Sequence, residues 1–301
     1  MHKIRIIYVI GQLSKGGAER QLYETVKGID KERFEPIVVS LSQDDYWADK
    51  IRKLGIELIE TPRKKHIEFS RLFKLIKIFR EKRPDIVHTY LFSANSYGRI
   101  AAILTKVPVV IASERNLPEI GKDKSRHQIF MDKLFSLFSH GIICNSYIAA
   151  ETLVTKYSFD TQKVFTVHNG IDVSPYLEES SKNQKKVAQE VVGTVGRLAI
   201  AKNHRLFLDM AKNIIDKSDN KDIKFLIVGE GALRDELKRY SQHLGIESKV
   251  VFTGQKNDVS DLLQMIDVFV LSSNWEGLSN AIMEAMASGL PCVVTDVGGN
   301  G

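Results

Sequence analysis

Apolar and polar positions alternate along the chain between short runs rich in β-branched residues and longer stretches with helical spacing. This alternation is typical of parallel sheets with helices wound on both faces. In the first half, the pattern predicts strands at 4–10, 36–41, 86–89, 109–113 and 142–145. It predicts helices at about 18–29, 70–81, 95–105, 125–138 and 148–157. These elements predict one doubly wound α/β domain.

A polar segment separates this half from a second one. Residues 172–189 read DVSPYLEESSKNQKKVAQ, a lysine-rich sequence with a proline that is typical of a linker. The alternation then resumes, with predicted strands at 191–195, 224–228, 250–253, 268–272 and 292–296. Helices are predicted near 203–215, 233–244, 259–265 and 280–287. We therefore expect two Rossmann-like domains, 1–171 and 190–301, with their strand ends towards a shared crevice.

Composition places the chain among ordinary folded proteins. Its 301 residues are 43% hydrophobic and 27% charged, and no run approaches the roughly 20 apolar residues of a membrane span. Cys144 and Cys292 lie in predicted buried strands, which favours reduced core thiols and a cytosolic compartment. We expect a cytoplasmic protein, soluble or peripheral to the membrane.

A net charge of +6 suggests an anionic partner, which nucleic acid, phospholipid headgroups or nucleoside diphosphates would each satisfy. The chain has no recognised nucleic-acid motif and no evident aromatic stacking platform, so no nucleic-acid partner is expected. Basic residues are dense from Arg63 to Arg83. The helix predicted there has an apolar face beside the basic residues Lys74, Lys77 and Arg80. The apolar residues on that face are Phe69, Leu72, Phe73, Ile76 and Phe79. This pattern predicts either contact with anionic membranes or a core-facing helix with a solvated basic side.

Two glycine-containing loops follow predicted strands. The first, GQLSKGGAER, resembles a P-loop in its Gly11-x4-Gly16 spacing, but Gly17 stands where the lysine is required. A bare backbone at Gly16 and Gly17 can approach a phosphate or sugar, or the loop is a plain tight turn. The other loop contains Gly229-x-Gly231 without the third glycine of a dinucleotide fingerprint, so we expect it to admit a nucleotide rather than NAD.

Two further loops carry charge. In VGRLAIAKN, Arg197 and Lys202 precede a helix, where cations are unfavourable unless they are solvated or an anion such as a diphosphate lies between them. In the segment from Ser272 onward, Glu276 and Glu284 lie eight residues apart. A helix capped by Ser279 or Asn280 would offer its N–H groups to a phosphate, and Glu284 would accept from a ribose diol, unless both carboxylates are simply solvated.

These segments occur in an order that resembles glycosyltransferase family 4, over essentially the whole chain: GGAER, VGRL with KN, VGEG with LRDEL, VFTG and EGLSNAIMEAMASGLPCVVTDVGG. The resemblance implies a GT-B fold with an acceptor-binding first domain and a nucleotide-sugar-binding second domain. It implies retaining transfer, with no metal or other cofactor, to a saccharide or lipid-linked saccharide in polysaccharide or glycoconjugate synthesis. No D-x-D pair, which metal-dependent transferases of the other major fold carry, is present.

The resemblance also assigns roles to residues. Arg197 and Lys202 would hold the donor diphosphate, Glu276 would lie by the donor sugar, and Glu284 would hold the ribose. The rest of the donor site would comprise Gly16, Gly17, Gly229, Gly231, Leu278, Ser279 and Asn280. His88 is expected either at the reacting centre or as a structural histidine, and the acceptor would meet Arg20, Glu114, Arg115 and Asn116. His168 and Asn169 are expected to be structural.

Family members continue beyond the position that matches Gly301, so we expect the second domain to be incomplete. The alternative function, motivated by that expectation, is a non-catalytic nucleotide-sugar-binding protein. An assay for sugar transfer would distinguish an active glycosyltransferase from such a binding protein. The donor sugar, the base and the linkage depend on pocket shape, and the sequence does not predict them.

Overall fold

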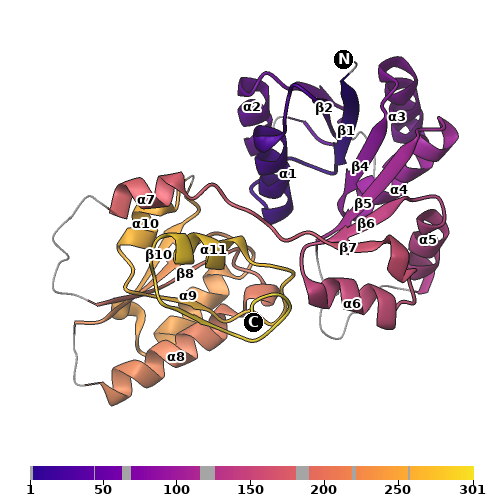
Figure 1. Ribbon diagram of the computed structural model, residues 1–301. Coiled ribbons are helices and arrows are strands. Elements are labelled where there is room, and N and C mark those ends of the chain that lie inside the picture. The colour runs from indigo at the N-terminus through magenta and orange to yellow at the C-terminus, as the bar shows by residue number, and fades with distance from the viewer. Residues whose placement is uncertain are drawn as a thin grey trace. The chain divides into compact units, whose positions relative to one another are not determined.

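The structure is a computed structural model that describes residues 3–43, 45–62, 69–115, 126–180, 190–218, 222–256 and 258–301. The chain divides into two compact units, Met1–Gly170 (unit 1) and Ile171–Gly301 (unit 2). Each unit contains one sheet, and every strand pair in both sheets is parallel (Figure 1). The predicted α/β class with two parallel-sheet Rossmann-like domains is confirmed.

The sheet of unit 1 has seven strands in the order β3-β2-β1-β4-β5-β6-β7. The strands are β1 (Ile4–Ile10), β2 (Phe34–Ser40), β3 (Glu57–Glu60), β4 (Ile86–Tyr90), β5 (Val109–Glu114), β6 (Gly141–Cys144) and β7 (Val164–Thr166). The helices are α1 (Gly17–Gly28), α2 (Tyr46–Lys53), α3 (Phe69–Lys82), α4 (Leu91–Leu104), α5 (Arg126–Ser136) and α6 (Tyr147–Thr155), and a 3₁₀ turn, η1, spans Thr161–Lys163.

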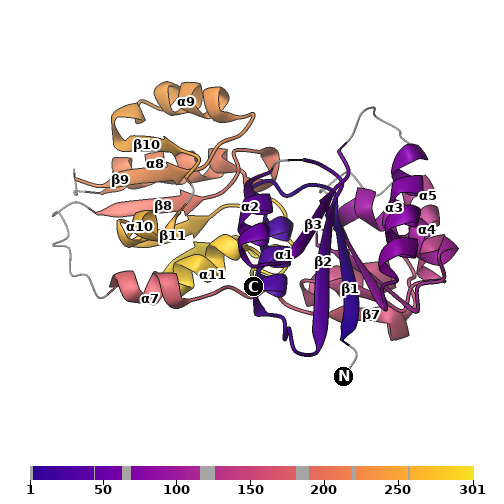
Figure 2. The same cartoon turned by 90° about the horizontal axis from the view of Figure 1, so that it is seen from above.

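Side chains alternate between the two faces of this sheet, and each face has its own helices. Ile7 and Val9 of β1 belong to a core with α3 and α4, whereas Tyr8 and Ile10 belong to a core with α1 and α2. Figure 2 shows α1 and α2 on one side of β1 and β2, and α3 and α4 on the other. A strand segment that is buried on both faces is apolar at successive positions, which explains the buried run 6–10 of β1.

Unit 2 has a five-stranded sheet in the order β10-β9-β8-β11-β12. The strands are β8 (Val191–Val195), β9 (Lys224–Val228), β10 (Val250–Gly254), β11 (Val268–Leu271) and β12 (Cys292–Val294). The helices are α7 (Ser174–Ser180), α8 (His204–Lys217), α9 (Arg234–His243), α10 (Ser260–Gln264) and α11 (Asn280–Ala287), with 3₁₀ turns η2 (Ile200–Lys202) and η3 (Glu247–Lys249). Buried residues of α8 and α9 pack on one face, and those of α7, α10 and α11 pack on the other (Figure 2).

The structure differs from the expected elements in three places. The pattern did not predict α2, β3 or β7, whose apolar runs are short. The segment 172–189, expected as a linker, begins with α7, and Tyr176 of this helix is buried in the unit 2 core; 181–189 lie outside the described residues. Cys144 is buried as expected, but Cys292 is only partly buried, and both are free thiols.

The basic helix α3 faces the core. Leu75, Ile78 and Phe79 are buried against the sheet, and Leu72 and Ile76 pack on them, so these side chains do not form the outward apolar face that one of the two sequence interpretations predicted. Phe73 is 67% exposed beside the exposed Lys74. Arg63 to Glu68 and the side chain of Phe69 lie outside the described part of the chain. Within the described ranges, no helix combines the length and apolar character needed to cross a membrane.

Candidate functional site

In unit 2, the strand order reverses beside β8. The chain runs from β8 to β9 and β10 on one side and then returns to β11 and β12 on the other. Loops that follow the two strands at such a reversal separate, and they leave a crevice at the carboxyl ends of the strands. Arg197 and Lys202 follow β8, and Glu276 follows β11. The topology therefore brings these predicted residues to one edge of the sheet.

The loops after β8 and β11 meet through an ion pair. The Lys202 Nζ contacts Glu276 Oε1, and the Ser273 hydroxyl donates to the same oxygen at 2.7 Å. The two charged side chains are 20% and 12% exposed. An ion pair with this little exposure is weakly screened, so both groups are held in place while still open to a ligand.

The backbone around Lys202 is also fixed. Asn203 takes a left-handed conformation with φ 43°, and its Nδ2 donates to Asn274 Oδ1 at 3.0 Å. The Asn274 Nδ2 in turn donates to the Ile200 carbonyl oxygen at 2.8 Å. His204 begins α8 beneath this turn; burial, with the Lys202 charge as second cause, lowers the pKa of His204 to about 4. The ring is therefore neutral at physiological pH and adds no positive charge here.

Two glycines secure the loop that carries Arg197. A Cβ at Gly229 would lie 2.0 Å from the Gly196 carbonyl oxygen, and one at Gly231 would lie 2.3 Å from that of Leu198. The Leu198 N–H donates to the Glu230 oxygen at 2.9 Å, and the Leu198 side chain is buried. The glycines thus allow two loops to pack backbone to backbone. Arg197 projects from this base as an exposed side chain, with no ion-pair partner among the described residues.

A third glycine supports Glu276, and the sequence alone did not reveal it. Gly298 has φ +60°, and a Cβ there would lie 1.9 Å from the Glu276 carbonyl oxygen. The next residue, Gly299, donates its N–H to the Gly277 oxygen at 2.7 Å. The glycine-rich end of the chain, VGGNG, was the available signal.

Helix α11 carries the remaining predicted donor residues. Ser279 occupies its N-cap position, but the Ser279 side chain makes no capping hydrogen bond, contrary to our expectation. The first N–H groups of the helix are therefore not satisfied by that side chain. Leu278 precedes the cap, Asn280 begins the helix, and Glu284 lies about one turn further on, 4% exposed.

In unit 1 the strand order reverses between β1 and β4. Gly16 is the N-cap of α1, and Gly17 is its first residue, as the glycine loop predicted. A Cβ at Gly16 would lie 2.1 Å from a carboxylate oxygen of Glu19, so this carboxylate fills the space that a side chain at 16 would need. Arg20 is partly buried and lies 3.9 Å from Glu24.

His88 lies on β4 at the same edge. Its Nε2 is 2.8 Å from the Ser113 hydroxyl, and its ring packs against the rings of Tyr8 and Tyr90, at centroid distances of 5.6 and 4.6 Å. Burial of the ring, with the Arg115 charge as second cause, lowers the pKa of His88 to about 3. His88 is consequently neutral at physiological pH and can exchange hydrogen bonds there, but it does not supply a positive charge.

The predicted acceptor residues Glu114 and Arg115 end β5. Asn95, fully buried on α4, donates to Glu114 Oε1 at 3.1 Å and accepts from the Thr89 hydroxyl at 2.7 Å. The sequence analysis did not single out Asn95, because an asparagine inside a helix carries no motif. The Arg115 guanidinium lies over the Tyr90 ring at 5.2 Å and donates to Asn169 Oδ1 at 2.6 Å. Asn116 lies outside the described residues.

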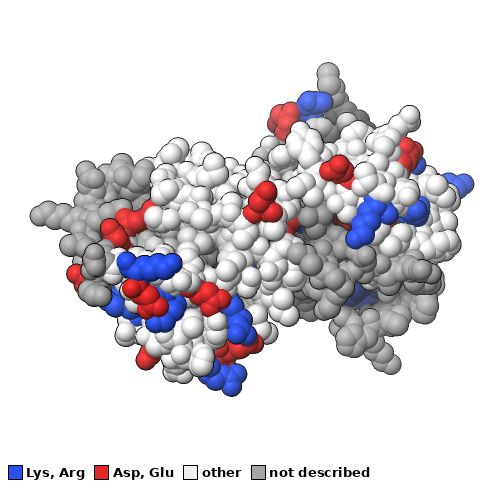
Figure 3. Space-filling view, turned by 90° about the horizontal axis from the view of Figure 1, so that it is seen from below, with Lys and Arg blue, Asp and Glu red and all other residues white. Residues whose placement is uncertain are grey.

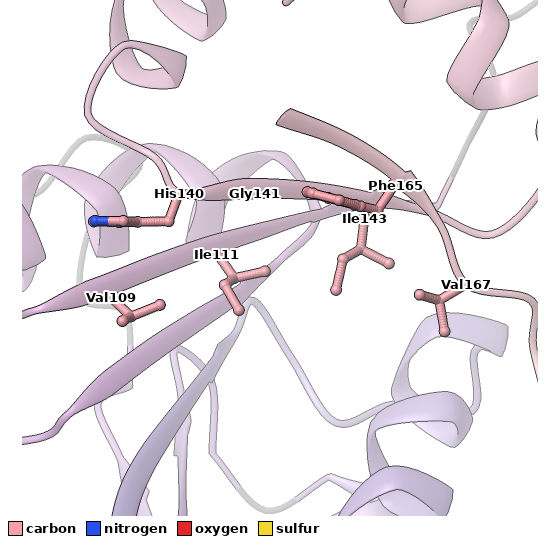
Figure 4. A pocket seen from close by; sticks show the side chains of 7 residues that line it. All are labelled: Val109, Ile111, His140, Gly141, Ile143, Phe165 and Val167. Atoms are coloured by element: carbon pink, nitrogen blue, oxygen red, sulfur yellow. The ribbon is translucent and has the colours of Figure 1, made fainter. Parts of the chain in front are cut away.

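Other described surfaces have fewer polar groups that could bind a ligand. A hollow of about 270 Å³ lies on β5, β6 and β7. Figure 4 shows the residues that line it: Val109, Ile111, His140, Gly141, Ile143, Phe165 and Val167. His140 is its only side chain with hydrogen-bonding atoms. On unit 2, Figure 3 shows basic and acidic side chains interspersed, consistent with pairs such as Lys212–Asp216. Within the described ranges, no three His, Cys, Asp or Glu side chains are grouped so as to hold a metal ion.

The fold and the two strand-end clusters define the class of two-domain Rossmann-like proteins with an anion-compatible site in the second domain. Comparison with known families then identifies the chain more closely. The family described as "Glycosyltransferase Family 4" matches residues 15–175, and the one described as "Glycosyl transferases group 1" matches residues 176–301. The chain belongs to the family 4 glycosyltransferases, as its motifs predicted.

Curated relatives span nearly the whole chain. An Escherichia coli UDP-Gal:alpha-D-GlcNAc-diphosphoundecaprenol alpha-1,3-galactosyltransferase is 29% identical in an alignment that covers 99% of this chain and 81% of the relative. A Campylobacter jejuni N-acetylgalactosamine-N,N'-diacetylbacillosaminyl-diphospho-undecaprenol 4-alpha-N-acetylgalactosaminyltransferase is 26% identical, over 98% of this chain and 81% of the relative. Together with the family matches, these similarities establish the enzyme class of glycosyltransferases.

Among solved structures, Anabaena HepE in complex with UDP-glucose superposes with a TM-score of 0.84 at 19% identity, covering 98% of this chain and 81% of HepE. WaaG, a glycosyltransferase involved in lipopolysaccharide biosynthesis, superposes with a TM-score of 0.73 at 17% identity, covering 98% of this chain and 82% of WaaG. At these identities the likeness concerns the fold, and it confirms the GT-B architecture.

Proposed function

We propose that the chain is a retaining glycosyltransferase that moves a sugar from a nucleoside diphosphate-sugar to a saccharide or lipid-linked saccharide, without a metal, in polysaccharide or glycoconjugate synthesis. One observation carries the proposal. Lys202 and Glu276 contact each other at the strand reversal of unit 2, and Arg197 projects from the adjoining loop without an ion-pair partner among the described residues. One cation held by a carboxylate, with a second cation on the adjoining loop, suits a diphosphate attached to a polar sugar.

The donor would bind at this edge of unit 2. Arg197 and Lys202 would contact the diphosphate, and the N–H groups at the start of α11 would add hydrogen bonds to a phosphate. Glu284 would accept from the two ribose hydroxyls, since a carboxylate has two acceptor oxygens suited to a vicinal diol. Glu276 would accept from hydroxyls of the donor sugar while it orients Lys202. HepE, which shares this fold, has been crystallised with UDP and with UDP-glucose, and this supports a nucleoside diphosphate-sugar as the class of donor.

In the reaction, the bond between the anomeric carbon and the diphosphate oxygen breaks, and the acceptor oxygen forms a bond to the same face of that carbon. The departing phosphate oxygen takes the proton of the acceptor hydroxyl. The products are the lengthened saccharide and the nucleoside diphosphate. The negative charge that grows on the phosphate during bond breaking is what Arg197 and Lys202 would stabilise, which lowers the barrier without a metal ion. His88, neutral and oriented by the buried Ser113 hydroxyl, would hold a sugar hydroxyl in place.

The acceptor would bind at the strand ends of unit 1, near Glu114 and Arg115. Relatives named for diphosphoundecaprenol-linked saccharides favour a lipid-linked acceptor, which requires contact with a membrane. On α3, exposed Phe73, Lys74, Lys77 and Arg80 provide a basic surface for anionic lipid, with Phe73 as an exposed apolar residue beside the three cations. Flotation with vesicles tests this contact. If the fraction of protein that floats with the vesicles depends on neither the anionic lipid content nor the salt concentration, this contact is refuted.

The transfer itself is tested by incubating the purified chain with a panel of UDP-, GDP- and dTDP-sugars and a GlcNAc-diphospholipid acceptor, in the presence of EDTA. We expect lipid-dependent release of one nucleoside diphosphate and a product with the α configuration of the donor, read by NMR. A product of inverted configuration would overturn the retaining mechanism. Strict dependence on added Mg²⁺ or Mn²⁺ would overturn the metal independence. Donor binding without turnover would favour the alternative, a nucleotide-sugar-binding protein.

A further inference from the structure

Tyr147 is an aromatic side chain exposed to solvent on a rigid base. It is 72% exposed, the highest value among the large apolar side chains that the structure describes. It is the first residue of α6, directly after Ser146, whose hydroxyl accepts the Ala149 N–H at 3.2 Å. The capped helix start fixes the backbone, so the ring is presented from a fixed position. An exposed aromatic ring held in this way marks a binding surface more often than an isolated exposed leucine does.

A second exposed ring supports the first. His168 follows β7, and its ring lies edge to face with Tyr147, at a centroid distance of 5.1 Å and an interplanar angle of 69°. His168 is itself exposed, and the preceding Val167 donates its N–H to the Cys144 oxygen at 2.9 Å, which ties this segment to the end of β6. The two rings therefore form a small aromatic shelf built from two adjacent strand ends. The sequence analysis treated His168 as structural, because a histidine before a linker carries no signal.

Both segments that carry the shelf also hold Arg115. Asn145, two residues before Tyr147, donates to the Arg115 carbonyl oxygen at 3.4 Å. Asn169, the residue after His168, accepts from the Arg115 guanidinium at 2.6 Å. The shelf consequently lies beside the polar cluster at the end of β5, on the same carboxyl edge of the unit 1 sheet. Neither ring takes part in the chemistry described above.

The shelf suits the face of a pyranose ring. One face of a hexopyranose presents C–H groups made slightly positive by the neighbouring oxygens, and such groups pack on the negative face of an aromatic ring. Arg115 and Glu114 then offer a donor and an acceptor to the hydroxyls at the rim of the sugar. We infer that Tyr147 and His168 form a stacking subsite for one pyranose ring of the acceptor saccharide. This inference rests on the proposed function and makes Tyr147 a specificity-determining residue for the acceptor.

Saturation-transfer NMR on the whole chain tests the subsite, with the methyl α-glycosides of GlcNAc, GalNAc, glucose and galactose as probes. We expect at least one glycoside to receive saturation mainly on the C–H protons of one ring face. Tyr147→Ala should weaken that binding about fivefold, and Tyr147→Phe, which keeps the ring face, should change it less than about twofold. His168→Ala should weaken binding by removing the ring that orients Tyr147. Phe130→Ala is the matched control, an aromatic on α5 that is 62% exposed, and should have no effect.

The inference is overturned if none of the four glycosides binds the wild-type chain, or if Tyr147→Ala binds them as the wild type does. Calorimetry with UDP separates this outcome from a failure of the proposed function. A wrong subsite leaves nucleotide binding and sugar transfer intact, with an unchanged acceptor KM in Tyr147→Ala. A wrong function shows as absent nucleotide binding or absent transfer in the wild type. The expected pattern is a raised acceptor KM in Tyr147→Ala with an unchanged donor KM.

Discussion

Replacing Lys202 by alanine should slow sugar transfer by roughly ten- to a thousandfold at saturating donor. The Nζ lies against Glu276, in a position fixed by the Asn203–Asn274 hydrogen bond and the Ser273–Glu276 hydrogen bond. A donor phosphate that enters this site would contact the same ammonium group. During bond breaking, about one further negative charge develops on the diphosphate, and only the interaction with that additional charge lowers the barrier.

The magnitude follows from the partial burial of Lys202. Two unit charges about 4 Å apart attract each other by about 4 kcal/mol at the effective dielectric constant of a partly buried site. The whole of this energy would correspond to about a thousandfold in rate. Part of the charge is already present in the bound donor, and a water molecule can replace part of the lost contact. About 1.4 kcal/mol, or tenfold, is therefore the lower limit that we expect.

The assay is release of nucleoside diphosphate at saturating donor and acceptor, with kcat and donor KM determined separately. Lys212→Ala is the matched control, since Lys212 forms a comparable ion pair with Asp216, at 2.7 Å, on the outer surface of α8. Lys202→Arg, which keeps the charge, should retain more activity than Lys202→Ala. Circular dichroism and melting temperature should show that all three variants fold. A kcat of Lys202→Ala within about threefold of Lys212→Ala would refute the role of Lys202 in stabilising the leaving group.

Three further predictions concern nucleotide affinity, loop packing and pH. Glu284→Gln should weaken UDP binding at least about fivefold by calorimetry, with little change in melting temperature, because charge-assisted hydrogen bonds to the ribose are lost; equal affinity would remove Glu284 from the site. Gly298→Ala should lower both melting temperature and donor affinity more than Gly289→Ala, since both glycines have positive φ but only Gly298 lies against another backbone; equal effects would contradict the close-approach argument. The pKa of His88 is lowered to about 3 in the folded state, so as the pH falls His88 is protonated in the unfolded state before it is protonated in the folded state. Protonation therefore favours the unfolded state, and the free energy of unfolding decreases as the pH falls from about 6.5 towards 3. His88→Gln should therefore lose less stability than the wild type between about pH 7 and pH 5 in urea unfolding, and equal losses would show that His88 is not buried in its neutral form.

The sequence by itself determined the architecture, because a strand buried on both faces has to be apolar at every position. The apolar runs 6–10 and 225–228 could therefore be assigned to strands without a structure. Helices of the second half were also predictable, since α8 and α9 carry clear apolar stripes opposite charged faces. Short elements such as β3 and α7 were not, because three to eight residues give too little periodicity to separate a helix or strand from a loop.

The candidate site also has a part that the sequence predicted and a part that only the structure revealed. Arg197 and Lys202 were candidates from residue type and position, because a cation before a helix start is unusual unless it meets an anion, whereas the role of Glu276 came from the resemblance to family 4. The sequence did not show that Lys202 and Glu276 touch, since they are 74 positions apart and only the strand order β8-β11 makes their loops neighbours. Tertiary structure likewise decided the role of Gly298 and assigned the apolar face of α3 to the core. The spacing of residues along the chain determines which side chains lie on the same face of a helix or strand. Only the packing around the sheet determines whether that face contacts the core, another loop or solvent.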